Sequence, residues 1–225
     1  MIDVKSIDGF LYSLEYQAMK RYAQEMYRKK ADTLDILEIG SYKGKSTVVW
    51  SRACSSHIVA IEPFCGPPEV PELVGISTEQ DFLNNTKQYR DQIRLIKKYS
   101  NDLSLCDDLL NQTFDIVFID GDHSYEAVVN DIKLALQYVT KNGLIMLHDY
   151  WINAASDFKF KGLSNAVHEH LMYKRKFLSL HRSLIVFENN INFKTYERSM
   201  RCLLLRRSRR TYRGHYRFIQ KSIRN

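Results

Sequence analysis

The sequence has few of the residues that cross-link a chain or direct it to a membrane. Its 225 residues include four cysteines, none in a C-x-x-C pair, so neither a zinc site nor a disulfide framework is indicated. The first residues lack the basic and apolar start of a signal peptide, and no run approaches the roughly 18 apolar residues of a membrane span. We therefore expect a cytoplasmic protein that is stabilised by an apolar core.

Charge is distributed unevenly along the chain. Apolar residues make up 44% and charged residues 26%, a composition that can bury a sizeable core and suits one domain with an appendage. The formal net charge is +7, yet residues 191–225 hold 11 Lys and Arg against one acid, so the rest of the chain is slightly acidic. We place the domain boundary near Asn189–Asn190, ahead of a basic tail of residues 191–225.

Helical and strand-like segments alternate over residues 1–190. An amphipathic segment from about Phe10 to Lys29 predicts an N-terminal helical cap over residues 1–30. The apolar runs that follow are typical of buried parallel strands: Leu34–Ile39, Ile58–Ile61, Ile93–Ile96, Phe114–Ile119 and Leu144–Leu147. Helical stretches lie between them: Ser46–Ala53, Glu79–Tyr89 and Tyr125–Tyr138. This order predicts an α/β domain over residues 31–190, a doubly wound parallel sheet with helices on both faces.

Two features mark the edges of the predicted sheet. Only three residues separate Phe177–Leu180 from Leu184–Phe187, a spacing that suits an antiparallel hairpin at one side. All four prolines fall within Pro63–Pro71, directly after the second strand. They predict a long irregular loop at the carboxyl edge, where doubly wound sheets bind ligands.

The first strand leads into a loop that opens a helix, a position where backbone N–H groups can face an anion. The run is Glu38-Ile39-Gly40-Ser41-Tyr42-Lys43-Gly44-Lys45-Ser46. A Walker A loop has four residues between its first glycine and Gly-Lys-Ser, and this loop has three. The dinucleotide motif G-x-G-x-x-G fails because Tyr42 and Lys45 stand where glycines belong. The pattern that remains, an acid followed by G-x-x-x-G, is that of S-adenosylmethionine-binding domains.

A second acid supports this interpretation. Glu62 ends the second strand 22 positions after Gly40, where such sheets place a carboxylate that accepts both ribose hydroxyls. The alternative is that Glu62 is a strand-end acid that faces solvent. The two motifs together, in a strand-loop-helix-strand context, favour a nucleoside site.

With its later motifs, the sequence resembles the class I S-adenosylmethionine-dependent methyltransferases, in particular the branch of cephalosporin-hydroxylase-like and macrolide or sugar O-methyltransferases. The motifs are the glycine loop, Ile61–Phe64, Phe118–Glu126 and His148–Tyr150, and the resemblance extends from about Gly9 to Glu188. It implies a Rossmann-like, seven-stranded sheet with an antiparallel C-terminal hairpin. It also implies cofactor contacts from Glu38, Gly40, Tyr42, Gly44, Ser46, Glu62, Ser100, Asn101 and Asp120.

Acidic residues follow two neighbouring strands. Asp120 ends the fourth strand and His148–Asp149 the fifth, so a parallel sheet brings them to one edge, beside the cofactor. Clustered carboxylates repel unless a cation or proton offsets them, and a hard divalent cation suits oxygen ligands. In the metal-dependent O-methyltransferases that this segment resembles, the residues that match Asp120, His148 and Asp149 are ligands, which implies Mg²⁺ or Mn²⁺ here. The alternative is that both carboxylates cap helices and that His148 is a buried, hydrogen-bonded residue.

His123 lies three residues beyond Asp120, where these relatives place a general base. Methyl transfer to a hydroxyl requires the acceptor oxygen to be aligned and its proton removed, which a neutral imidazole can do at cytosolic pH. The alternative is a structural histidine.

The predicted activity is O-methylation of a small molecule, sugar or glycan by S-adenosylmethionine, with a divalent cation and His123 as the base. One rival is an RNA methyltransferase that uses the basic tail, although the chain has Asp-Gly-Asp-His where base-methylating enzymes commonly have a Pro-Pro-Tyr type of motif. The other rival is a non-catalytic cofactor-binding module. The tail itself, which mixes arginines with apolar residues, could bind a polyanion or an anionic membrane surface, or could be a solvated end.

Overall fold

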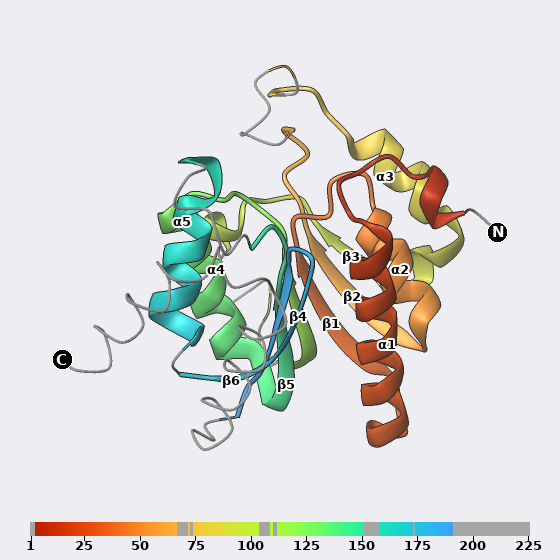
Figure 1. Cartoon of the computed structure of the whole chain (residues 1–225). Helices are drawn as coiled ribbons and strands as arrows, with labels where there is room; N and C mark the ends of the chain where they lie inside the picture. Colours follow the sequence, from red (N-terminus) through yellow and green to blue (C-terminus); the bar gives the residue numbers. More distant parts are fainter. Residues whose placement is uncertain are drawn as a thin grey trace.

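Seven strands form one sheet at the centre of the described chain (Figure 1). The computed structural model describes residues 3–66, 72, 74–103, 109, 112–150, 158–172 and 174–190. The strand order is β3-β2-β1-β4-β5-β7-β6. The strands are β1 (Leu34–Ile39), β2 (Ser56–Ile61), β3 (Ile93–Ile96), β4 (Phe114–Ile119), β5 (Val139–Leu147), β6 (Lys176–His181) and β7 (Leu184–Glu188).

Strands β1 to β5 pair in parallel, and β7 runs antiparallel to both β5 and β6. The predicted hairpin is therefore confirmed, with β6 at the edge and β7 inserted beside β5. All six residues of β4 are buried, because a parallel strand in the middle of a sheet is covered on both faces. The five parallel strands end at the same edge, and that edge holds the candidate site.

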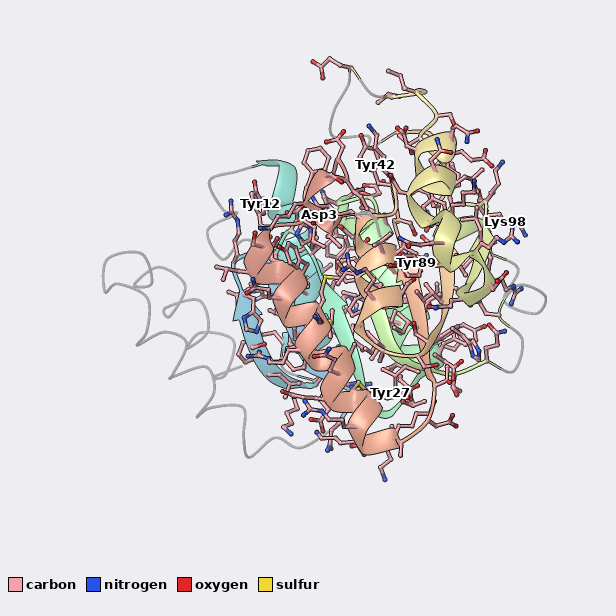
Figure 2. The ribbon with its side chains drawn as sticks, turned by 90° about the vertical axis from the view of Figure 1, so that its right-hand side faces the viewer. Asp3, Tyr12, Tyr27, Tyr42, Tyr89 and Lys98 are labelled. Atoms are coloured by element: carbon pink, nitrogen blue, oxygen red, sulfur yellow. The ribbon has the colours of Figure 1, made fainter. Side chains whose placement is uncertain are left out.

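Helices cover both faces of the sheet (Figure 1). The helices are α1 (Ser13–Lys30), α2 (Lys45–Ala53), α3 (Glu79–Thr86), α4 (Tyr125–Tyr138) and α5 (Phe158–Val167). One core joins α1 and α2 to one face, with Trp50 packed edge-on against Phe118 at 5.7 Å between ring centroids. The other core joins α4 and α5 to the opposite face. In the view of Figure 2, α1 runs along the molecule with Tyr12 at its start and Tyr27 near its end.

Several element boundaries differ from the sequence prediction, among them the end of α3 and the start of β5. The helix expected to run to Tyr89 ends at Thr86 and continues as a 3-10 turn over Lys87–Gln92. Strand β5 begins at Val139, ahead of the apolar run, because Val139 pairs with Phe114 of β4.

Two of the predicted segments lie largely or wholly outside the described residues. They are the proline loop beyond Gly66 and the basic tail of residues 191–225. Within the described part of the chain, none of the helices combines the length and apolar character that a bilayer crossing needs.

Gly40 fixes how the loop after β1 crosses β4. It has a φ of +85°, and a Cβ at this position would lie 2.1 Å from the carbonyl oxygen of Asp120. The Gly40 amide donates to the Ile61 carbonyl at 2.9 Å, so the backbone here touches both neighbouring strands. Only glycine fits this approach, since it combines a left-handed conformation with the absence of a side chain.

We expect Gly40→Ala to lower the free energy of unfolding by about 2 to 4 kcal/mol, the combined cost of a left-handed alanine and of overpacking. Gly75→Ala is the matched control, because Gly75 has a φ of +78° but an added Cβ there would have none of the described residues within 4 Å. It should show the conformational cost alone, roughly 1 to 2 kcal/mol. Urea unfolding of both variants measures the difference, and equal losses would contradict the close approach to Asp120.

Candidate functional site

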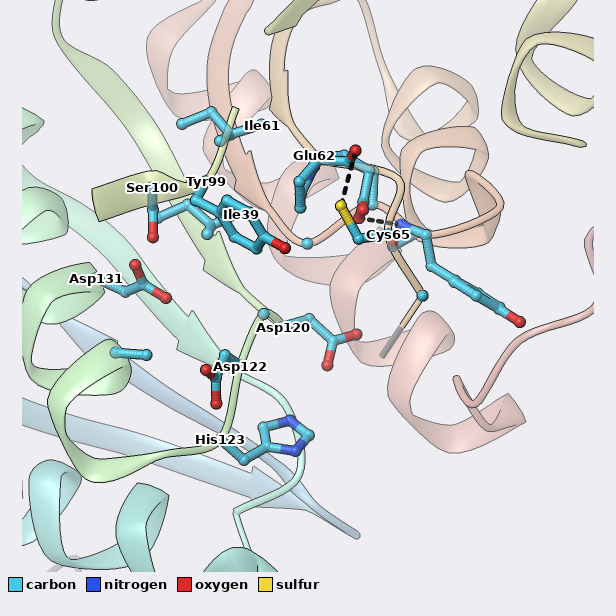
Figure 3. A pocket seen from close by; sticks show the side chains of 18 of the residues that line it. Ile39, Ile61, Glu62, Cys65, Tyr99, Ser100, Asp120, Asp122, His123 and Asp131 are labelled. Atoms are coloured by element: carbon cyan, nitrogen blue, oxygen red, sulfur yellow. Dashed lines mark hydrogen bonds between the residues drawn. The ribbon is translucent and has the colours of Figure 1, made fainter. Parts of the chain in front are cut away.

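A cavity of about 490 Å³ opens at the carboxyl edge of the sheet, over the ends of β1, β2 and β4 (Figure 3). It is bounded by the loops that follow these strands and by α4. Most of the residues that the sequence predicts for the site line this cavity: Gly40, Tyr42, Ser46, Glu62, Ser100, Asn101, Asp120, His123 and Asp149. Segments that are far apart in the sequence thus converge on one space large enough for a nucleoside and a small acceptor.

Glu62 is held rigidly at the wall of the cavity. Its Oε2 accepts a hydrogen bond from the backbone N–H of Tyr42 at 2.7 Å, and its Oε1 accepts one from the N–H of Phe64 at 2.8 Å. Burial raises the pKa of this carboxyl, while the backbone hydrogen bonds oppose that effect. A carboxylate offers about four lone-pair sites, so both oxygens keep acceptor capacity for a ligand.

Glu38 and Gly44, predicted as cofactor contacts, do not line the cavity. Glu38 is fully buried beneath the loop, where its Oε2 accepts from the hydroxyls of Ser41 at 3.1 Å and Thr47 at 2.5 Å. Burial raises its pKa to about 7. Gly44 adopts a φ of +82° at the start of α2, and an added Cβ would lie 2.8 Å from a methyl carbon of Thr86. Both residues therefore support the conformation of the loop without lining the cavity.

Asp120, His123 and Asp149 form a cluster at the lower end of the cavity, where Figure 3 shows the His123 ring close to Asp120. Each offers one ligand atom, and these three atoms lie within 4.8 Å of one another. His123 Nε2 is 3.7 Å from Asp149 Oδ2. Asp149 has a φ of +53°, a left-handed conformation that is uncommon for a residue with a side chain and is often found at functional sites.

His148, which the resemblance implies as a metal ligand, contacts the carboxylates of Asp120 and Asp149 but is not one of the three residues of this cluster. It is fully buried, and its two ring nitrogens are turned to carboxylates. Nε2 lies 3.1 Å from Glu15 Oε2, and Nδ1 lies 3.1 Å from Asp120 Oδ1 and 3.5 Å from Asp149 Oδ2. The alternative of a buried, hydrogen-bonded histidine describes His148, and His123 takes its place among the possible ligand atoms.

The three carboxylates around His148 determine its charge. Burial alone would lower the pKa of His148, but the pull of Asp120, Asp149 and Glu15 outweighs it and raises the pKa well above 6.5. The ring therefore carries both protons and donates from both nitrogens. Burial also raises the pKa of Asp120, whereas the hydrogen bond from His148 lowers that of Asp149 against the effect of burial. A buried imidazolium thus offsets part of the negative charge at the site.

Glu15 is a functional-site residue that the sequence analysis missed. Its Oε1 accepts from the backbone N–H of Ser183 at 3.0 Å and from the Ser183 hydroxyl at 2.6 Å, and its Oε2 accepts from Tyr12 N–H at 2.8 Å. With His148, these contacts join the start of α1, the end of β5 and the β6–β7 turn. The signal was present in the sequence, since Glu15 stands four residues before Met19 on the buried face of the helix.

The strand order and the loop positions are those of a class I S-adenosylmethionine-dependent methyltransferase. Residues 37–150 match the methyltransferase-domain family (Methyltransf_24), and the chain belongs to this family.

The chain is similar in sequence to one viral protein and in fold to solved methyltransferase structures. An uncharacterized protein, R132 of Acanthamoeba polyphaga mimivirus, is 30% identical over 148 residues, which span 63% of this chain and 62% of that relative. Among solved structures, the O-methyltransferase NovP superposes with a TM-score of 0.59 at 15% identity, covering 79% of this chain and 80% of its own. An O-methyltransferase from Bacillus cereus in complex with SAH gives 0.56 at 15% identity, covering 82% and 85%. At these identities the structures show a shared fold.

We expect Glu15→Gln to lower the free energy of unfolding by roughly 3 kcal/mol or more, because it leaves a buried imidazolium without one partner. The same substitution at the partly exposed Glu25 of the same helix is the control and should change stability by less than about 0.5 kcal/mol. Thermal or urea unfolding measures both. Equal stability of Glu15→Gln and the unchanged chain would show that the Glu15 contacts contribute nothing.

The difference between the unchanged chain and Glu15→Gln should also depend on pH. Hydrogen bonds from His148 and Ser183 outweigh burial and lower the pKa of Glu15 from 4.5 to about 2, so its contribution is complete above pH 4.5 and is lost as the pH falls toward 2. The raised pKa of His148 makes its contribution complete below pH 6.5 and lost as the pH rises through that raised value. Unfolding free energies measured across this range should differ most between about pH 4.5 and 6.5. A difference that grows toward pH 2 would contradict the assignment.

Proposed function

We propose that the chain transfers the methyl group of S-adenosylmethionine to a hydroxyl oxygen of a small molecule, sugar or glycan. The observation that carries this proposal is that one cavity joins the Glu62 carboxylate, the glycine loop and the Asp120–His123–Asp149 cluster. The likeness of the fold to O-methyltransferases, one of them in complex with SAH, supports the choice of methyl donor and of oxygen as the acceptor.

The residues present fit the methyl donor. Gly40 lines the cavity without a side chain, so the backbone of the loop can approach a ligand closely. Glu62 offers two fixed acceptor oxygens, which suits a ribose with two neighbouring hydroxyls. The loop from Gly40 to Ser46 would hold the methionine end, in the same cavity as the acidic cluster.

Methyl transfer is a direct displacement in which the O–CH₃ bond forms as the S–CH₃ bond breaks. The protein has to align the acceptor oxygen with the sulfonium methyl and remove the hydroxyl proton. We assign proton removal to His123, which lines the cavity beside Asp120 and Asp149. Exposed apolar side chains at the same cavity, Phe10 and Val74, can contact an apolar part of the acceptor.

A divalent cation, Mg²⁺ or Mn²⁺, fits the donor set of this cluster. Asp120 and Asp149 would hold it, because hard cations take carboxylate oxygens and keep several waters. Such a cation would lower the pKa of a hydroxyl bound to it. The buried imidazolium of His148 stands behind both carboxylates and fixes their positions.

The partner proposed for residues 191–225 remains a polyanion or an anionic membrane surface. The basis is the local excess of Lys and Arg, which attracts such surfaces in a salt-dependent way. The tail lies outside the described residues, and cutting at Asn190 removes none of the residues assigned to the site.

The donor site is tested by Glu62→Gln. We expect its affinity for S-adenosylhomocysteine to fall by roughly 10-fold to 100-fold, the usual effect of losing hydrogen bonds to a charged group. Glu79→Gln is the control, because Glu79 pairs with Lys97 outside the cavity and should leave affinity unchanged. Isothermal calorimetry measures both, with unfolding curves to establish that the variants are folded. Equal affinity in Glu62→Gln and the unchanged chain would remove Glu62 from the site.

The cation and the base are tested together with Mn²⁺, whose free concentration is read by electron paramagnetic resonance. Asp149→Asn should weaken Mn²⁺ binding by roughly 10-fold or more, since even residues behind the ligands have effects of this size. Asp122→Asn, which removes a carboxylate outside the group of three from the loop of Asp120 and His123, should not. His123→Ala should keep Mn²⁺ affinity but lower kcat by roughly 10² to 10⁴ with an acceptor found by screening hydroxyl compounds. Loss of Mn²⁺ affinity in His123→Ala would make His123 a ligand instead of the base.

A further inference from the structure

The loops that carry His123 and Asp149 share a support that the proposed reaction does not use. His123 follows β4 and Asp149 follows β5, so each side chain is carried by its own loop. Helix α5 and the π-helical turn that continues it, His168–Met172, contact both loops. A π turn is rare in proteins and is frequently found at functional sites.

The first contact joins α5 to the loop of His123. Helix α5 lies beside α4 (Figure 1). A Cβ added to Gly162 would lie 2.6 Å from the backbone nitrogen of Tyr125 and 2.8 Å from the carbonyl oxygen of His123. The backbone of α5 therefore touches the loop directly, an approach that only a residue without a side chain permits. The Tyr125 hydroxyl also donates a hydrogen bond to Glu169 in the π turn.

The second contact joins the π turn to the residue after Asp149. The Tyr150 hydroxyl and His168 Nε2 form a hydrogen bond of 2.8 Å, and the two rings stack with 6.1 Å between their centroids. Both residues are buried, so breaking this hydrogen bond would leave polar atoms away from water. The backbone N–H of Tyr150 donates to the Ser183 carbonyl at 2.9 Å. Tyr150 is thus fixed through its backbone and through its ring.

Asp149 has a backbone conformation that needs such support. Its φ of +53° is left-handed, and a residue with a side chain stays in this region only where the surrounding structure holds it there. Tyr150 is the next residue, so its contact with His168 restrains the backbone of Asp149 and with it the direction of the carboxylate. That direction matters because Asp149 Oδ2 lies 3.7 Å from His123 Nε2 in the cluster.

We propose that Tyr150 and His168 are positioning residues, whose hydrogen bond holds the Asp149 carboxylate where it can bind a divalent cation together with Asp120. This inference rests on the proposed function and adds two residues to it. Neither Tyr150 nor His168 lines the cavity, so both act through Asp149. Residues that orient metal ligands in this way typically change metal affinity by about 10-fold to 100-fold when they are replaced.

The test measures Mn²⁺ affinity by electron paramagnetic resonance in Tyr150→Phe, which removes the hydroxyl but keeps the stacked ring. We expect the affinity to fall by roughly 10-fold, because Asp149 loses its restraint. His168→Leu should have the same effect, whereas His168→Gln can still form a hydrogen bond with the Tyr150 hydroxyl and should keep most of the affinity. Tyr138→Phe is the matched control, because Tyr138 is also buried but lies at the opposite end of α4 from the His123 loop.

A double variant and unfolding curves separate positioning from a purely structural role. Tyr150→Phe combined with His168→Leu should bind Mn²⁺ no more weakly than either single variant, since both remove the same contact. Lower thermal stability with unchanged Mn²⁺ affinity in Tyr150→Phe would overturn the inference and leave the cation site intact. An equal loss of affinity in His168→Gln and His168→Leu would do the same. Failure of the unchanged chain to bind Mn²⁺ would instead overturn the cation site of the proposed function, and this inference with it.

Discussion

The arrangement of the site depends on one buried ionic network, the His148 imidazolium between Glu15, Asp120 and Asp149. Two carboxylates at neighbouring strand ends would repel each other in the low dielectric of the interior, and a fixed cation behind them offsets that repulsion. The network needs every member, since removing one partner of a buried ion pair leaves an uncompensated charge. It also reaches across the molecule, because Glu15 belongs to the first helix whereas His148 ends the fifth strand. The N-terminal helix therefore helps to hold the site residues in position.

The parallel sheet supplies the other constraint. Because β1, β2 and β4 end at the same edge, residues about 80 positions apart come to face one cavity. The acidic residues at the ends of β1 and β2 lie in different environments. Glu38, near the end of β1, is turned inward and accepts hydrogen bonds from the hydroxyls of Ser41 and Thr47, whereas Glu62, directly after β2, remains at the cavity wall. Two strand-end glutamates thus have different environments, one that shapes the loop and one that is available to a ligand.

The sequence predicts the fold well because the signals are local and agree with each other. The apolar runs of Leu34–Ile39 and Phe114–Ile119 match strands β1 and β4 in full. The site is less predictable, because a motif gives the position of a residue along the chain but not the direction of its side chain. His148 follows a strand as a ligand would, yet it points inward to Glu15, which stands 133 positions away.

The central claim is that the strand-end cavity binds the methyl donor next to the Asp120–His123–Asp149 cluster. A crystal structure of the protein with S-adenosylhomocysteine and Mn²⁺, including the anomalous signal of manganese, tests it most directly. The account predicts the ribose on Glu62, the sulfur facing the cluster, and a manganese peak between Asp120 and Asp149. Nucleoside density away from Glu62, or a manganese peak only at another part of the protein surface, would contradict it.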